Sequence, residues 1–350
     1  MSLKLHPVIQ KDIEEICRTL GNKLNQFEGM DILITGAGGM LARYLVYTLL
    51  HANDLYFKKK CTLHLVTRGS KTPFGTRRDI EYIQVDIAHD PLPSMQVDYI
   101  VHAASKAAPK IYTKHMIDTL NTNIKGLYHV LDIVSPKTIS ILYFSSGEIY
   151  GNPPKDTKLT EDYLGTTDHL NDRSCYVEGK KAGETICMNY FREKGYPIKI
   201  ARIFHTFGPG LNLDDGRVFS DFMKDGLAKK NIQVKGDKDM QRAFLYIRDA
   251  TIMFFMLLVS DKNGEVYNIA NDQNVVSVQQ LAEVMRNEFN TYYDRKIRID
   301  YQKNNRNLYH HAPHMVVPDI SKFEKDFDFT PHISLSEAVH QTISSYMPYG

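Results

Sequence analysis

A glycine-rich turn between a short apolar segment and a helical segment constrains the fold of this chain most strongly. Residues 31–35 (DILIT) have the pattern of a short buried strand, and residues 40–50 have the pattern of a helix. Glycines between a strand and a helix let the backbone approach a pyrophosphate group, which binds at the partly positive N-terminus of the helix. The segment therefore predicts a dinucleotide-binding site. Its expected cofactor-binding residues are Gly36, Gly38, Gly39 and Met40.

Further apolar segments follow at the spacing of parallel strands that are joined by helical crossovers. These strand-like segments are residues 61–67, 80–85, 97–103, 139–145 and 198–204. Residues 113–134 and 175–194 lie between or after them and have helical patterns. We therefore predict an α/β fold, namely a Rossmann-type doubly wound parallel sheet with a smaller α/β C-terminal substrate lobe.

The pattern along the chain predicts three parts. Residues 1–29 form an amphipathic N-terminal helix extension, which packs against the chain's own surface or, as an alternative, takes part in dimerisation. Residues 30–208 form the NAD(P)-binding Rossmann domain, which is completed by about residues 244–272. Residues 209–243 and 273–350 form a substrate lobe at the carboxyl edge of the sheet, where ligands bind in such folds.

Composition excludes several classes of function. The formal charge is only +2, from 43 basic and 41 acidic side chains, so we expect no nucleic-acid partner. No apolar run approaches the roughly 18 residues that a membrane span needs, and the start of the chain has no signal-peptide pattern. The cysteines are widely spaced and form no metal-binding motif, so we expect reduced thiols in a cytoplasmic protein and no metal site. They are Cys17, Cys61, Cys175 and Cys187.

Residues at the ends of the predicted strands bear on the cofactor. After the second strand, an acid would bind the adenosine ribose, but this chain has Val66-Thr67-Arg68 there. Arg68 could accommodate the 2′-phosphate of NADP, stack on adenine or face solvent, so NAD is expected and NADP stays open. Asp86 and Ile87 are expected to contact adenine. Three small residues after the fourth strand are expected to lie against the cofactor: Ala103, Ala104 and Ser105.

Tyr176 and Lys180 are the expected centre of the chemistry. They lie four residues apart in the predicted helix 175–194, so their side chains share one face of it. A fixed ammonium group near a phenol favours the phenolate and lowers the phenol pKa from about 10. We therefore expect Tyr176 to accept a proton near neutral pH. The alternative is an ordinary pair on the surface of a helix.

A serine-rich turn at residues 141–151 (ILYFSSGEIYG) supplies two further candidates. This turn and the start of the helix that carries Tyr176 both belong to the carboxyl edge of a doubly wound sheet. Ser146 could therefore hydrogen-bond the oxygen that Tyr176 deprotonates, and Glu148 could be a second acid–base group. The alternatives are a turn-forming serine and a solvated glutamate.

Together these segments resemble the extended short-chain dehydrogenase/reductase family of nucleotide-sugar epimerases, dehydratases and decarboxylases. The resemblance covers roughly residues 30–345. It implies a Rossmann domain that holds NAD(P), a lobe that holds a nucleoside diphosphate sugar, and a catalytic set of Ser146, Tyr176 and Lys180. It also implies oxidation of the sugar at C4, recycling of the cofactor within each turnover, and a homodimer. The matching segments are TGAGGM (35–40), DI (86–87), HAAS (102–105), SSGEIYG (145–151), Tyr176-x-x-x-Lys180, RIFHTFGPG (202–210) and QRAFLYIRD (241–249).

Within this family the chain is most similar to the UDP-glucuronate decarboxylases, in residues 160–165, 173–187 and 202–223. Glu148 fits decarboxylases and 4,6-dehydratases better than epimerases. However, decarboxylases carry an arginine just before Pro-Asp-Ile, and this chain has Val316-Val317 there. The expected function is decarboxylation of UDP-glucuronate, with 4,6-dehydratase or 4-epimerase as alternatives. A catalytically silent nucleotide-sugar or dinucleotide sensor is an alternative of another class, and a ketone reductase with dissociable NADPH is favoured only by Arg68.

The resemblance also implies residues for the substrate. Arg242 is expected to clamp the diphosphate through its planar guanidinium group, and Arg217 either does likewise or faces solvent. His205 stands where relatives have asparagine, and Gly210 stands where they have arginine.

Overall fold

A parallel seven-stranded sheet forms the centre of the protein. The computed structural model describes residues 4–69, 72–154, 157–302 and 315–348. The strand order is β11-β7-β5-β4-β1-β2-β3, and all neighbouring strands are parallel. The predicted Rossmann-type sheet is therefore confirmed. Its strands are β1 (Asp31–Thr35), β2 (Thr62–Thr67), β3 (Ile80–Gln84), β4 (Tyr99–His102), β5 (Ser140–Ser146), β7 (Ile198–Ile203) and β11 (Val266–Ile269).

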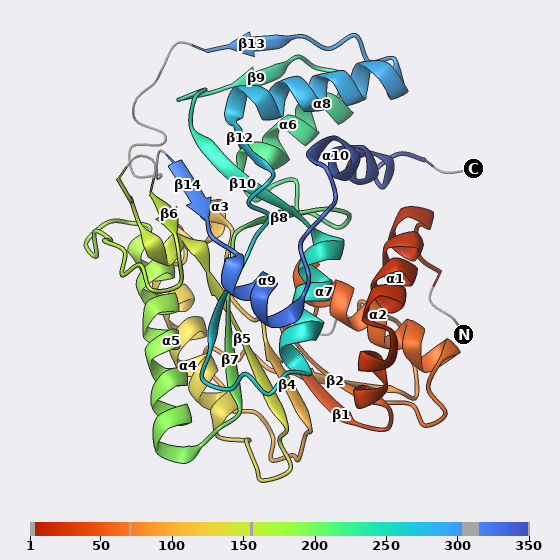
Figure 1. Ribbon diagram of the computed structural model, residues 1–350, viewed down its shortest axis with the longest axis vertical. Helices are drawn as coiled ribbons and strands as arrows, with labels where there is room; N and C mark the ends of the chain where they lie inside the picture. The colour runs from red at the N-terminus through yellow and green to blue at the C-terminus, as the bar shows by residue number, and fades with distance from the viewer. Residues whose placement is uncertain (1–3, 70–71, 155–156, 303–314, 349–350) are drawn as a thin grey trace.

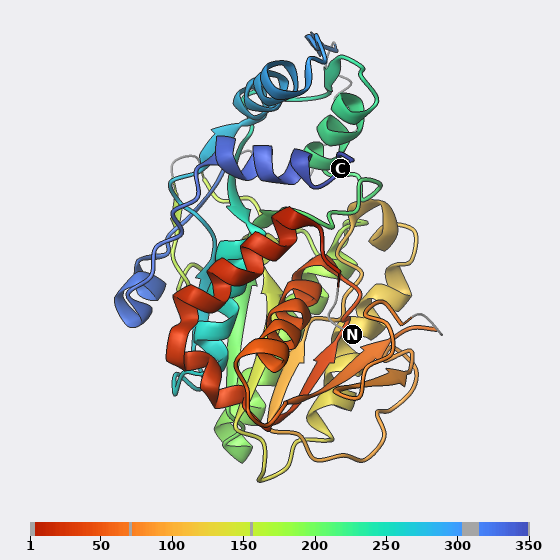
Figure 2. The same ribbon diagram turned by 90° about the vertical axis from the view of Figure 1, so that its right-hand side faces the viewer.

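Helices cover both faces of this sheet, with α4 and α5 on one face and α2 and α7 on the other (Figures 1 and 2). The alternation of side chains along β1 shows why both faces need cover. Leu33 packs into the core on the side of α4 and α5, whereas Ile32 and Ile34 pack into the core on the side of α2 and α7. The covering helices are α2 (Met40–Leu55), α4 (Met116–Leu131), α5 (Ser174–Lys194) and α7 (Ile247–Leu258).

A smaller α/β lobe sits over the carboxyl edge of the sheet, at the top of Figure 1. It contains a sheet in the order β12-β10-β14-β6, with β8 paired to β10, and a separate pair, β13-β9. The strands β6 and β8 precede residue 209 in sequence, yet they pair with lobe strands. The elements are β6 (Lys158–Leu159), β8 (His205–Phe207), β9 (Ile232–Val234), β10 (Gln241–Tyr246), β12 (Val275–Ser277), β13 (Ile299–Tyr301), β14 (Met315–Pro318), α6 (Val218–Leu227), α8 (Val278–Tyr293) and α10 (Leu335–Ser344). Helix α9 (Ser321–Phe327) instead packs on β11 of the large sheet, where Phe323 and Phe327 contact Tyr267.

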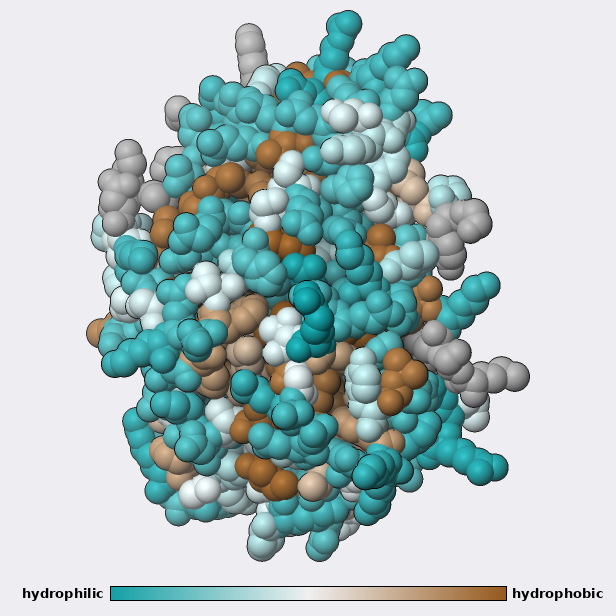
Figure 3. Space-filling view, turned by 45° about the vertical axis from the view of Figure 1, so that its right-hand side comes forward, coloured by the Kyte–Doolittle hydropathy of each residue, from teal (hydrophilic) through white to brown (hydrophobic). Residues whose placement is uncertain are grey.

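The N-terminal helix α1 (Pro7–Leu20) packs on α2 and α7, so it lies against the chain's own surface. Its apolar residues from Ile13 onward are buried, including Ile16 and Leu20. Figure 3 shows the side of the molecule on which α1 lies, and hydrophilic side chains predominate there. A 3₁₀ turn, η1 (Gly21–Phe27), connects α1 to β1.

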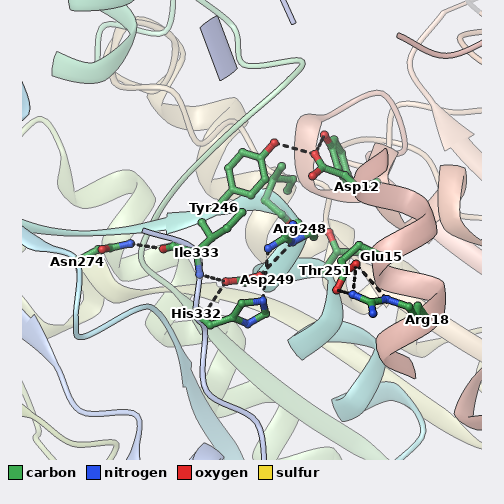
Figure 4. Close-up of polar contacts among 12 residues, drawn as sticks. Asp12, Glu15, Arg18, Tyr246, Arg248, Asp249, Thr251, Asn274, His332 and Ile333 are labelled. Carbon is green, nitrogen blue, oxygen red and sulfur yellow. Dashed lines mark hydrogen bonds and ion pairs between the residues drawn. The ribbon is translucent and has the colours of Figure 1, made fainter. Parts of the chain in front are cut away.

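One acidic residue of α1 is buried in the interface with α2 and β10. Asp12 is only 3% exposed, and its carboxylate accepts hydrogen bonds from the hydroxyl groups of Tyr44 (2.9 Å) and Tyr246 (2.7 Å). Arg248 and Asp249 lie close by, at the start of α7 (Figure 4). Burial raises the pKa of Asp12 to about 6, although both tyrosine hydroxyls act to lower it.

The structure gives three further findings on the described residues. No helix among them is long and apolar enough to cross a bilayer. No group of three or more His, Cys, Asp or Glu side chains in this part of the chain is placed to hold a metal ion. The four cysteines are free thiols.

Candidate active site

A cavity of about 570 Å³ lies between the carboxyl edge of the large sheet and the lobe. It brings together residues that are far apart in sequence, because β1, β5, β7 and the start of α5 all end or begin at this edge. Most of the predicted site residues line it: Gly36, Gly38, Gly39, Met40, Arg68, Ala103, Ser105, Ser146, Glu148, Tyr176, Lys180, His205, Arg217 and Arg242.

Three predicted cofactor residues lie outside the lining of this cavity. Ile87 is buried against Gly126, where its backbone oxygen contacts the ring of His129. Asp86 accepts a hydrogen bond from the backbone of Ala88. Ala104 packs behind the glycine turn instead of facing the cavity. Contact of Asp86 and Ile87 with adenine therefore stays a prediction.

The glycine turn between β1 and α2 has the geometry that a dinucleotide needs. Gly36 has φ +66°, and a Cβ atom there would lie 2.8 Å from the Cα atom of Ala104, so only glycine fits. A Cβ atom on Gly38 would meet nothing within 4 Å, which leaves this side of the turn open. Gly39 is the N-cap of α2 and provides no side-chain cap for the first amides of the helix. These residues fit a pyrophosphate group at the helix N-terminus.

Arg43 is a further residue of this end that the sequence reasoning missed. Its guanidinium group donates a hydrogen bond of 2.8 Å to the carbonyl oxygen of Gly38. The same group lies 3.9 Å from the place where a Cβ atom of Gly210 would be. Arg43 therefore reaches from the first turn of α2 toward the segment that carries Gly210, and it lines the cavity between them. Arginine in the first turn after a glycine pattern could have been noted as a signal.

The predicted catalytic residues meet at the other end of the cavity. Ser146 ends β5, and its hydroxyl oxygen accepts a hydrogen bond from the backbone of Glu148 (3.2 Å) at the start of the short 3₁₀ helix η2 (Gly147–Tyr150). Tyr176 and Lys180 lie one turn apart on α5 and are 5% and 2% exposed. The structure thus brings the three side chains of the expected set together with Glu148.

The expected lowering of the Tyr176 pKa is wrong for this structure. Burial raises the pKa of Tyr176 to about 12, the charge of Glu148 raises it further, and Ser146 and Arg217 oppose these effects only in part. The position of Lys180 explains why its ammonium group does not offset the effect of burial. Its ammonium group donates to the carbonyl oxygen of Phe144 (2.7 Å) and lies 6.0 Å from the centre of the Tyr176 ring.

Lys180 is itself perturbed by its surroundings. Burial lowers the pKa of its ammonium group to about 7, and the nearby charge of Glu184 opposes this effect only in part. Its ammonium also lies 5.1 Å from the centre of the Tyr143 ring, over which a cation is attracted. Near pH 7 the Lys180 side chain is therefore close to its titration point.

An aromatic and ionic group surrounds Tyr176. The ring of Tyr112, from the short helix α3 (Pro109–Tyr112), stacks on the Tyr176 ring with centroids 5.2 Å apart and an angle of 7°. The guanidinium group of Arg173 lies 5.5 Å from the centre of the Tyr112 ring. Arg173 also pairs with Glu148 at 3.2 Å. The sequence reasoning missed Tyr112 and Arg173, although Arg173 lies one helical turn before Tyr176.

The lobe side of the cavity is positively charged. Arg242 is 7% exposed, and among the described residues it donates to the carbonyl oxygen of Gln241 and to the sulfur of Met240, with no carboxylate partner. Burial lowers the pKa of Arg242 to about 10, so it remains cationic at neutral pH. Arg217 donates to the Ala107 carbonyl oxygen at 2.8 Å. A buried guanidinium group that makes no ion pair with the described residues fits a phosphate ligand.

His205 lies among these arginines. Burial and the charges of Arg242, Arg217 and Arg173 hold the pKa of His205 well below its usual range. Its ring is therefore neutral at pH 7, and its Nδ1 atom is buried without a hydrogen-bond partner in the described part of the chain. Lys106 also lines the cavity and pairs with Asp118 at 2.6 Å. The position of Lys106 directly after the HAAS segment was its only sequence signal.

Comparison with known proteins places the chain among enzymes. The sequence model of the "NAD dependent epimerase/dehydratase family" matches residues 32–270. UDP-glucuronic acid decarboxylase 1 of Arabidopsis thaliana is 31% identical over 323 residues, which cover 90% of this chain and 69% of that protein. UDP-glucuronic acid decarboxylase 1 of Xenopus tropicalis is 28% identical over 361 residues, which cover 96% of this chain and 80% of that protein.

Solved structures share the fold. Epimerase Mth375 of Methanothermobacter thermautotrophicus superposes with a TM-score of 0.79 at 18% identity, over 94% of this chain and 96% of that chain. The dTDP-glucose 4,6-dehydratase of Bacillus anthracis superposes with a TM-score of 0.72 at 19% identity, over 91% and 96%. The resemblance stated from the sequence is confirmed. The chain belongs to the NAD dependent epimerase/dehydratase family of enzymes, with NAD as its cofactor.

Proposed function

We propose that this enzyme decarboxylates UDP-glucuronate, or a closely related nucleotide-linked uronate, through a transient 4-keto sugar. The observation that carries the proposal is a single cavity that joins a dinucleotide turn, the set of Ser146, Tyr176 and Glu148, and a cluster of arginines. Relatives near 30% identity over about 90% of the chain are UDP-glucuronic acid decarboxylases, which supports the choice of substrate.

In this mechanism Tyr176 is the acceptor for the proton of the sugar 4-hydroxyl group, and Ser146 hydrogen-bonds the same oxygen. Bound at the glycine turn, NAD would supply the hydride acceptor for C4 and, in reduced form, the hydride donor for the final reduction. Lys180 donates to the Phe144 carbonyl oxygen, with its nitrogen 6.0 Å from the centre of the Tyr176 ring, and is the group we assign to a cofactor ribose hydroxyl. Because the pKa of Tyr176 lies near 12 in this structure, loss of its proton depends on Ser146 and Arg217, which lower that pKa against the effects of burial and Glu148.

The ketone at C4 makes the bond between C5 and the carboxylate easy to break. Its electron pair moves into the ketone as an enolate, and carbon dioxide leaves. The protonated Tyr176 then stabilises the enolate oxygen by a hydrogen bond, and C5 takes up a proton before C4 is reduced. Glu148 is the acid–base group that we assign to the C5 side, since it lies next to Ser146 at the same end of the cavity.

The lobe supplies the binding energy for the nucleotide. We assign the diphosphate to Arg242 and Arg217, whose charges act on the neutral ring of His205. Residues 209–243 and 273–350 would then form the nucleotide-sugar lobe, with residues 30–208 and about 244–272 as the NAD-binding domain. Binding energy from the diphosphate, which does not react, orients the sugar carbons at Tyr176.

Two other outcomes of the same 4-keto chemistry have support. Glu148 beside the catalytic pair also suits a 4,6-dehydratase, and Val316-Val317 in place of an arginine suits a sugar without a carboxylate. A 4-epimerase would use the same Ser146 and Tyr176. A silent sensor would not need Tyr176 and Lys180 buried beside Ser146, so we place it last.

The deciding experiment is incubation of the purified protein with UDP-glucuronate, UDP-glucose and UDP-galactose, followed by mass spectrometry and NMR of the products. Loss of the mass of carbon dioxide from UDP-glucuronate supports the proposal. Loss of the mass of water indicates dehydration, and an unchanged mass with altered ring couplings indicates epimerisation. No product from any nucleotide sugar, together with tight binding, would favour the sensor.

We also infer a homodimer formed through α4 and α5. The outer side of α4 carries Ile117, which is 78% exposed, together with the exposed Leu120 and Tyr128. An apolar strip of this kind is a common site of association, and a second copy could cover it symmetrically. Ile117→Lys should then convert a dimer into a monomer in sedimentation experiments, whereas a monomeric wild type would contradict the inference.

The four free thiols support a reducing compartment such as the cytoplasm.

A further inference from the structure

We propose that Arg173 binds the carboxylate of the sugar and thereby selects uronates over neutral hexoses. The inference rests on the proposed function for the identity of the nucleotide sugar, but it concerns recognition and not the reaction. It assigns a role to a residue that the sequence pattern did not single out. Its basis is the position of one guanidinium group relative to Tyr176 and Glu148.

Arg173 is held at the catalytic end of the cavity. It is the N-cap residue of α5, one turn before Tyr176, and its guanidinium group lies over the Tyr112 ring that stacks on Tyr176. Its side chain is 31% exposed and lines the cavity. The group is therefore fixed by packing yet open to a ligand that enters beside Tyr176.

The carboxylate of a uronate must approach this point if Tyr176 acts on the 4-hydroxyl group. C5, which bears the carboxylate, is bonded to C4, so the carboxylate lies on the ring carbon next to the one on which Tyr176 acts. The charge of Glu148 is at the same end and would repel a second carboxylate. Arg173 pairs with Glu148 at 3.2 Å, and its five N–H donors allow it to hold a second carboxylate as well.

Three other cations of the cavity are less suited to this task. Arg217 is held by Asp215 and the Ala107 carbonyl, and Lys106 is held by Asp118. Arg242 has no carboxylate partner in the described part of the chain, but it projects from the lobe strand β10, where we assign the diphosphate. Arg173 is thus the cation that already contacts an acid next to the catalytic serine and tyrosine.

Calorimetric binding of UDP-glucuronate, UDP-glucose and UDP to Arg173→Gln tests the proposal, with Arg192→Gln as the matched control. Arg192 lies on the same helix, is exposed and does not line the cavity. In Arg173→Gln we expect the Kd for UDP-glucuronate to rise by about 30-fold or more, and the Kd values for UDP-glucose and UDP to change by less than about threefold. Arg173→Lys should recover part of the loss, because it keeps the charge but not the planar fork.

A double variant, Glu148→Gln with Arg173→Gln, distinguishes two effects of Arg173. Arg173 either binds the substrate carboxylate directly or only neutralises the charge of Glu148. We expect it to bind UDP-glucuronate as weakly as Arg173→Gln does. Recovery of wild-type affinity in the double variant would mean that Arg173 only neutralises Glu148, and the proposal would be wrong. Equal losses for all three ligands, or a wild type that binds UDP-glucuronate no more tightly than UDP-glucose, would also overturn it. If UDP-glucuronate binds through Arg173 but is epimerised, the proposed reaction fails and this inference stands.

Discussion

Replacement of Asp12 by asparagine should stabilise the protein by an amount that grows with pH. The carboxyl pKa rises from 3.8 to about 6 in the folded protein, chiefly because Asp12 is 3% exposed. Because the pKa is higher in the folded protein, the contribution of this group to stability is fully present below pH 3.8, the pKa in the unfolded chain. This contribution is lost as the pH rises through about 6. Ionisation of Asp12 therefore disfavours the folded state by up to about 3 kcal/mol above neutral pH.

The most direct test is how the difference in free energy of unfolding between Asp12→Asn and wild type changes with pH. Asparagine has no charge at any pH, and it can still accept the hydrogen bonds of Tyr44 and Tyr246. Any hydrogen-bond energy that it loses is the same at each pH and cancels. The stability of Asp12→Asn relative to wild type should rise by about 1.4 kcal/mol between about pH 5 and about pH 7.5.

Urea denaturation at several pH values measures this difference directly. Glu14→Gln is the matched control, because it makes the same change of charge on the exposed side of α1. We expect the control to show no comparable rise. A stability difference for Asp12→Asn that is constant over this pH range, or that shrinks as the pH rises, would refute the reasoning that burial controls the ionisation of Asp12.

Three further predictions concern the site. Gly36→Ala should destabilise the protein by about 2 kcal/mol or more and abolish NAD binding, because φ is +66° and the new methyl group meets the backbone of Ala104. Gly38→Ala is the control, and it should keep the wild-type Tm because the space around Gly38 is open. Equal Tm values for the two variants would contradict this. Lys180→Met should gain stability relative to wild type as the pH falls from about 10 to about 7, since the pKa of Lys180 is lowered to about 7 in the folded protein. A difference in urea midpoints that does not change with pH would contradict this lowered pKa. Tyr176→Phe keeps the stacked ring and should retain UDP binding while product formation falls by at least about 10²-fold, and wild-type turnover would exclude Tyr176 as the proton acceptor.

Local rules of the chain were enough for the architecture and for part of the site. The strand, glycine turn and helix at residues 31–55 are specified by residues that are adjacent in sequence, and the structure has them as β1 and α2. The spacing of Tyr176 and Lys180 places both on one face of α5 because a helix fixes that geometry by itself. The apolar strand-like segments alternate with helical ones, and this pattern predicts a parallel sheet because strands that are apolar on both sides need helices on both faces of the sheet.

Properties that depend on burial or on distant partners needed the tertiary structure. The sequence alone predicts a lowered pKa for Tyr176 from its neighbour Lys180, whereas the fold buries Tyr176, places Glu148 near it and draws Lys180 to a carbonyl oxygen of β5. The same holds for Arg173, whose pairing with Glu148 joins two segments that only the sheet edge brings together. Sequence spacing fixes which residues share a face, but desolvation and charge interactions act through space, so their sign was decided only when distant segments packed against one another.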